Sequence, residues 1–163
     1  MDTSELRRSE LVGLIAAVVL IGSLFGEWFS LETDPSIVER SETDENDWVC
    51  GIGNGSCSAF DTFPILRWLL LAAASAPIIL AYLVMRGTRL SWPRGEVTAI
   101  VGLTAFVLIA YNGIIDRPND GLEVSLSYGY WIALLASLGI FLAGGFRAVE
   151  SGGGGRRKPP ATF

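Results

Sequence analysis

Histidine is absent from the 163-residue sequence, and only two residues are cysteine. Histidine is the side chain that most often serves as a general base or a metal ligand near neutral pH, and two thiolates alone cannot complete a zinc coordination sphere. The other residues offer no paired carboxylates, no nucleophile beside a base and no phosphate-binding loop. We therefore expect a non-enzymatic protein without catalytic, cofactor-binding or metal-binding residues, and without a nucleic-acid partner.

Charge is nearly missing from the stretch between Phe63 and Met85, which only Arg67 interrupts. Arg67 lies in the first turn, where a long side chain can reach the membrane interface. A helix needs about 20 apolar residues to cross a hydrocarbon core of roughly 30 Å. A soluble helix of this length would show a polar stripe, which this stretch lacks. The stretch therefore predicts a membrane span.

Three shorter apolar runs are also predicted to be spans. The chain as a whole is too hydrophobic for an ordinary soluble domain, since 50% of the residues are hydrophobic and the mean hydropathy is +0.44. The predicted fold is an all-α integral membrane protein: a four-transmembrane-helix bundle with a small extracytoplasmic loop or β patch. Its predicted parts are an N-terminal segment at 1–10, a membrane domain at 11–146 with spans at about 11–29, 63–85, 97–115 and 128–146, an outer loop at 30–62, and a disordered tail at 147–163.

The basic residues predict the orientation of these spans. Most of the 12 lie near the N-terminus, between Arg86 and Arg94, or in the C-terminal tail, which leaves Arg40, Arg67 and Arg117 on the other side. Because cytoplasmic loops collect lysine and arginine, both termini are expected in the cytoplasm, with the protein in the cell (plasma) membrane. The acidic residues of 30–62 then lie outside.

Both cysteines, Cys50 and Cys57, fall in this outer loop and bracket a glycine-rich segment. In an oxidising compartment, a disulfide between them would stabilise the loop by about 2 to 3 kcal/mol on the chain-entropy model. A redox role is the alternative, although membrane thiol oxidoreductases require a C-x-x-C pair and a second pair to exchange with. Asn54-Gly55-Ser56 fits both a glycosylation sequon and a tight turn.

A short strand is predicted near the start of the fourth span. The turn sequence from Asp116 to Gly121 is followed by Leu122, Val124 and Leu126, which alternate with polar residues. This period of two is typical of a half-buried strand. The predicted outer patch therefore combines the cysteine loop with a strand at 122–127.

Polar and aromatic residues of the spans are assigned structural roles. The polar groups within the spans are expected to form hydrogen bonds between helices or to their own backbone, and they are Ser75, Thr104, Tyr111 and Asn112. Pro77 removes one backbone hydrogen bond and predicts a helix kink. Tryptophans at span ends form the aromatic belt expected at a membrane interface, and these interfacial anchors are Trp28, Trp68, Trp92 and Trp131.

Several short motifs resemble a loose group of uncharacterised bacterial four-span membrane proteins. They are Gly26–Phe29, Ser58–Asp61, Tyr111–Pro118, Tyr128–Leu134 and the pair Gly144-Gly145. The resemblance covers most of the chain and implies no activity. A weaker likeness is to claudins, whose first outer loop has a Trp-Cys-Cys pattern and whose second span follows an arginine, as with Trp48, Cys50, Cys57 and Arg67. The cysteines here are closer together, so the likeness implies no paracellular function.

The leading hypothesis is a non-enzymatic multi-pass membrane protein, structural or partner-interacting, whose acidic, disulfide-closed outer loop contacts a partner. Its partners are the lipid bilayer and either a membrane or envelope protein or a second copy of the chain. The alternative is a subunit of a small oligomeric cation channel or transporter, because rings of acidic side chains concentrate cations at a pore mouth. No ionisable residue is expected near the bilayer centre, which weakens the alternative.

Overall fold

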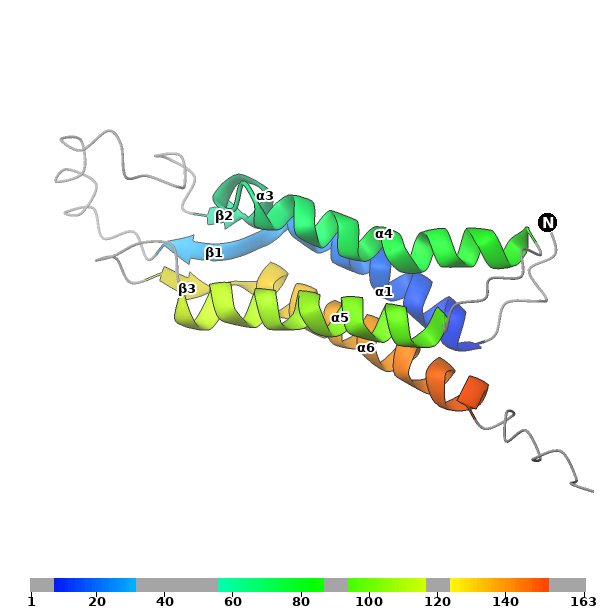
Figure 1. Ribbon diagram of the computed structural model, residues 1–163. Coiled ribbons are helices and arrows are strands. Elements are labelled where there is room, and N and C mark those ends of the chain that lie inside the picture. Colours follow the sequence, from blue (N-terminus) through cyan, green and yellow to red (C-terminus); the bar gives the residue numbers. More distant parts are fainter. Residues whose placement is uncertain (1–7, 32–55, 87–93, 117–123, 153–163) are drawn as a thin grey trace, which may run out of the picture.

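The computed structural model describes residues 8–31, 56–86, 94–116 and 124–152, which are mostly helical (Figure 1). Within these ranges the four long helices are α1 at Arg8–Leu24, α4 at Leu66–Met85, α5 at Arg94–Ala110 and α6 at Tyr128–Gly152. Helix α5 continues as a π-helix, η3, at Tyr111–Ile115. The short elements are helix α3 at Ala59–Thr62 and strands β1 at Glu27–Leu31, β2 at Ser56–Ser58 and β3 at Val124–Leu126.

Three helical stretches in the described part of the chain are long and apolar enough to cross a membrane: Leu66–Met85, Gly95–Ile115 and Tyr128–Glu150. They mark the chain as a membrane protein and overlap three of the predicted spans. Helix α1 has 17 residues. At a rise of 1.5 Å per residue it is about 25 Å long, which is less than the roughly 30 Å of a hydrocarbon core. The fourth span therefore stays a prediction.

The strands and α3 gather at one end of the bundle, the sheet end, where α1 ends and α4 and α6 begin (Figure 1). The other end, which we call the opposite end, holds the beginnings of α1 and α5 and the ends of α4 and α6. The first and last described residues therefore lie at the same end of the molecule.

The bundle has a core of small and branched side chains and an outer surface of large apolar ones. Ala17, Leu70 and Ile109 are fully buried, whereas Ile79 and Leu135 are 54% and 66% exposed. A soluble protein rarely leaves such extended apolar surface in water. Lipid tails are as apolar as these side chains, so the outward faces fit a bilayer.

Helices α5 and α6 pack with their backbones in close approach. A Cβ atom added at Gly102 would lie 2.8 Å from Phe141 Cα, and one added at Gly144 would lie 2.8 Å from Ala99 Cα. Real Cβ atoms essentially never come this close to backbone atoms. The glycines therefore permit this crossing, as small residues do between membrane helices.

The first predicted span, 11–29, is wrong at its C-terminal end. Helix α1 stops at Leu24, and Glu27–Leu31 forms strand β1. Two backbone N–H groups close the helix end, since Phe25 N donates to Gly22 O at 3.2 Å and Gly26 N donates to Ser23 O at 3.1 Å. Aromatic residues just beyond an apolar run resemble an interfacial belt, and that pattern concealed the strand.

Strand β1 is the centre of a three-stranded antiparallel sheet with the order β2-β1-β3. Phe29 is opposite Cys57 of β2 on one side and Leu126 of β3 on the other. Strand β3 lies inside the stretch whose alternation predicted a strand, so this part of the prediction is confirmed. The sheet joins three segments that are far apart in the sequence.

The predicted disordered tail at 147–163 begins too early. Helix α6 continues to Gly152, and Arg147 forms an ion pair with Glu10 of α1. Because that pair joins the helix to its neighbour, the first residues assigned to the tail belong to the bundle. Residues 153–163 lie outside the described ranges.

Candidate functional site

Four aromatic side chains join the sheet to the helices at the sheet end. Trp28 makes edge-to-face contacts with Tyr130 and Phe63, with ring centroids 5.8 and 6.3 Å apart, and Phe29 packs on Phe63 at 5.9 Å. Trp28, Phe29 and Tyr130 are fully buried. Edge-to-face pairs of this kind contribute about 0.5 to 1.5 kcal/mol each beyond the area they bury. We call these four residues the aromatic cluster.

A β-bulge explains how two consecutive residues of β1 are both buried. The pairing with β2 runs from Glu27 opposite Ser58 to Phe29 opposite Cys57, so Trp28 is an extra residue on the β1 side. Side chains of a regular strand alternate between faces, whereas a bulge re-aims a side chain. The bulge therefore lets Trp28 and Phe29 both enter the core.

Trp28 also binds the end of α1, because its Nε1 donates a hydrogen bond of 2.7 Å to Ser23 O. Ser23 lies in the last turn, whose carbonyls have no partner within the helix. The prediction that Trp28 is an interfacial anchor is corrected by its burial, since an anchor must reach the headgroup region and this side chain is 0% exposed.

Tyr130 rests against the π-helix that ends the third long helix. A Cβ atom at Gly113 of η3 would collide with the Tyr130 ring, and both residues are buried. Single π-helical turns often accompany functional sites. Here the lack of a side chain at Gly113 leaves room for the Tyr130 ring of α6, so the π-helix packs against the aromatic cluster.

Strand β1 is also hydrogen-bonded to the segment that leads into α6. Ser127 N donates to Trp28 O at 2.8 Å, and the hydroxyls of Ser30 and Ser125 are 2.7 Å apart. A Cβ atom at Gly129 would lie 2.5 Å from Glu27 O, so the start of α6 touches the strand backbone. The sheet and the bundle therefore form one packed unit.

The remaining predicted site residues are distributed over the sheet end and α4. Cys57 is buried in β2, while Cys50 lies outside the described residues, as do Asn54 and Trp92, so the disulfide stays a prediction. Trp68 and Trp131 are 60% and 51% exposed near the sheet-end starts of α4 and α6, where interfacial anchors are expected. Pro77 lies inside α4 and is buried.

Polar residues within the helices bind their own backbone. The side chains of Ser75, Thr104 and Asn112 donate to the carbonyls of Ala72, Ile100 and Leu108, at 2.7, 2.9 and 2.8 Å. This confirms one of the two arrangements expected from the sequence. Each of these three side chains therefore donates a hydrogen bond within its own helix.

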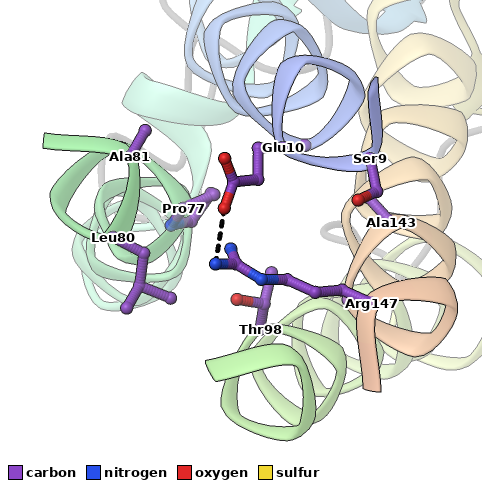
Figure 2. Close-up of a pocket in the computed structure, with 10 residues that line it drawn as sticks. Ser9, Glu10, Pro77, Leu80, Ala81, Thr98, Ala143 and Arg147 are labelled. Carbon is purple, nitrogen blue, oxygen red and sulfur yellow. Dashed lines mark ion pairs between the residues drawn. The ribbon is translucent and has the colours of Figure 1, made fainter. Parts of the chain in front are cut away.

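A small pocket at the opposite end contains a buried ion pair that the sequence reasoning missed (Figure 2). Arg147 Nη2 lies 2.5 Å from Glu10 Oε1, and the two side chains are 15% and 5% exposed. Glu10 belongs to the first turn of α1 and Arg147 to the last part of α6. Both positions fall in segments that the sequence predicts to lie outside the membrane domain, so no sequence signal joins them.

All four long helices contribute to this pocket, through residues that include Ser9, Pro77, Thr98 and Ala143. Its cavity volume is about 20 Å³, which is enough for one water molecule and too little for an organic substrate. The Ser9 hydroxyl is buried without a hydrogen-bond partner, so a water molecule fits its chemistry. The pocket is therefore a polar connection between helices rather than a substrate site.

Comparisons of the chain with models of protein families, with curated proteins and with solved structures find no match.

Proposed function

We propose that this chain is a non-enzymatic, multi-pass protein of the plasma membrane that presents a folded patch outside the cytoplasm. The patch comprises the three-stranded sheet and α3, and the predicted acidic loop at 30–62 adjoins it. Together they contact a membrane or envelope protein or a second copy of the chain. The observation that carries the proposal is the aromatic cluster, which fastens a sheet of three distant segments to the helices.

A rigid patch suits binding because little conformational entropy is lost when a partner docks. Among the described residues, β2 and β3 are the short edge strands of the sheet, and an edge strand is where the strand of a partner can pair. The predicted bridge between Cys50 and Cys57 would restrain the loop next to β2. The chemistry that distinguishes this chain from a plain helix bundle is therefore concentrated at the sheet end.

Helix α1 is proposed as the fourth span. Outward-facing residues such as Ile15 and Val18 are 55% and 59% exposed, as apolar residues are on the other spans. The helix also packs along α4 and α6, and only two residues separate its end from the start of β1. Four spans, together with the basic residues near Arg86 and Arg94, favour cytoplasmic termini.

Protease treatment of spheroplasts tests the orientation. The loop at 30–62 should be cut from outside, whereas the connection at 86–94 should be cut only after the membrane is permeabilised. Cleavage in the reverse order would place the patch in the cytoplasm and remove the proposal.

Photo-crosslinking tests the contact itself. p-Benzoylphenylalanine at Glu27, which is exposed on β1, should give one adduct of defined mass, and an adduct near twice the chain mass of 17.5 kDa identifies self-association. The same group at Arg86, exposed at the opposite end, is the matched control. No adduct from Glu27, or identical adducts from both positions, would count against a partner at the patch.

A second candidate, a cation-conducting oligomer, is favoured by the acidic side chains at the sheet end. Glu27, Asp61 and Asp116 are all exposed there, and acidic rings attract cations to a pore mouth. Liposomes that contain the purified protein should then show cation flux above that of empty liposomes. Equal flux would eliminate this candidate and leave the first one untouched.

A further inference from the structure

Arg67 occupies an unusual position where α4 begins. Its Nη1 donates a 3.0 Å hydrogen bond to Phe60 O of α3. Its guanidinium carbon lies 4.8 Å from the centroid of the Phe60 ring and 5.7 Å from that of Trp68. Both distances are within the roughly 6 Å of a cation–π contact. The guanidinium is therefore held in one place before any ligand arrives.

Most hydrogen-bonding capacity of this group is unused. A guanidinium has five N–H donors, and Phe60 O is its only acceptor within the described ranges. Nε is buried without a partner, and a buried unpaired donor destabilises the folded protein. An arginine kept at this cost, with further donors to offer, has the chemistry of an anion site.

The surroundings of Arg67 are those of a membrane interface. Phe25 stacks on Phe60 with ring centroids 5.1 Å apart. Phe25, Ile65 and Trp68 are 63%, 75% and 60% exposed. Exposed aromatic and apolar side chains beside a cation at the start of a membrane-spanning helix match the layer where acyl chains meet headgroups.

Electrostatics favours a lipid over a dissolved anion. Arg67 is the sole cation among the described residues of the sheet end, which also exposes Glu27, Asp61 and Asp116. These carboxylates repel free anions that approach from water. A phospholipid reaches the site within the bilayer and presents its phosphate at the depth where the helix begins.

We propose that Arg67, flanked by Phe60 and Trp68, binds the phosphodiester group of a phospholipid in the leaflet at the sheet end. Arginine is suited to this ligand because its planar fork can donate two parallel hydrogen bonds to phosphate oxygens. The site depends on the chain being a membrane protein and on neither the partner contact nor the direction in which the sheet end faces.

The other end of α4 supplies a matched control. Arg86 also lies over an aromatic ring, with its guanidinium carbon 5.2 Å from the Tyr82 centroid. Arg86 is exposed, and only one ring lies under its guanidinium in the described structure. Replacing Arg86 therefore removes an equal charge and a similar ring contact without touching the proposed site.

Native mass spectrometry of the full-length protein in detergent tests the proposal with phosphatidylglycerol as the probe. Arg67→Gln should weaken phosphatidylglycerol binding about 10-fold, because a hydrogen bond to a charged group contributes about 1.5 to 3 kcal/mol. Arg86→Gln should leave binding within about 2-fold of wild type. A glycolipid with the same acyl chains and no phosphate should bind wild type and Arg67→Gln equally. Inorganic phosphate at millimolar concentration should not displace the lipid.

Arg67→Lys keeps the charge and loses the fork, so it should bind more weakly than wild type and more strongly than Arg67→Gln. If Arg67→Gln loses the helical circular dichroism signal of the wild type, Arg67→Lys is the variant whose lipid binding is compared with wild type. Equal phosphatidylglycerol binding by wild type and a folded Arg67 variant would overturn the proposal. Displacement by inorganic phosphate would overturn it too, since the site would then take a free anion.

Discussion

Removing one partner of the buried ion pair should destabilise the bundle strongly. Glu10→Gln keeps the shape of the side chain and removes the Glu10 charge from beside the Arg147 guanidinium, which is 15% exposed. Breaking a buried pair in this way costs about 3 to 5 kcal/mol. The pair lies at the end of the bundle, where water is close, so we expect the lower value, about 3 kcal/mol.

A charge exchange separates pairing from simple burial. In the double variant Glu10→Arg with Arg147→Glu, the two charges face each other again. They are then reversed relative to the helix dipoles, since α1 begins near residue 10 and α6 ends shortly after residue 147. Each reversed dipole contact costs about 0.3 to 1 kcal/mol. The exchange should therefore recover part of the loss and remain below wild type.

Reversible unfolding in mixed micelles, followed by circular dichroism, measures these free energies. Arg8→Gln is the matched control, because Arg8 is exposed in the same turn of α1, and surface substitutions usually change stability by no more than about 0.5 kcal/mol. A Glu10→Gln variant as stable as Arg8→Gln would refute the reasoning. No recovery in the charge exchange would show that the pair adds no coupling energy.

Three further predictions concern packing and the outer patch. Gly102→Leu should prevent α5 and α6 from closing and abolish the folded state in thermal unfolding, whereas Gly22→Leu, with nothing within 4 Å of an added Cβ, should be tolerated. Trp28→Leu should cost about 3 kcal/mol of unfolding free energy, because it removes a large buried ring and a hydrogen bond to Ser23 O. Wild-type protein purified without reductant should show no free thiol on alkylation, and Cys50→Ser should raise protease sensitivity at 47–61 while helical content is unchanged.

The long helices were predictable because one physical signal dominates them. Apolar runs long enough to cross a bilayer have few other uses, so the stretch at 63–85 already predicted the helix now placed at Leu66–Met85. Strand β3 was predictable for a similar reason, since the alternation around Val124 and Leu126 is a local pattern. Each of these elements is predicted by the residues of one short segment of the sequence.

The parts that escaped prediction depend on contacts between distant residues. The pairing of Phe29 with Leu126 fixes β1, and no local pattern near Phe29 distinguishes a bulged strand from an aromatic belt. The ion pair of Glu10 with Arg147 joins opposite ends of the chain. The glycines of α5 and α6 matter only once the two helices are known to cross at them.

The position of β1 has a consequence for biosynthesis. Ser30 and its partner Ser125 are 95 residues apart in sequence, and Tyr130, which packs against Trp28, comes later still. A nascent or truncated chain that stops before β3 and α6 can pair β1 with β2 alone. The β3 side of β1 then stays open, and Trp28 lacks the Tyr130 ring. Exposed strand edges and hydrophobic surface are what chaperones and proteases recognise. The sheet therefore closes only when the last helix is present, and we expect chains that end before it to be degraded faster than the full-length protein.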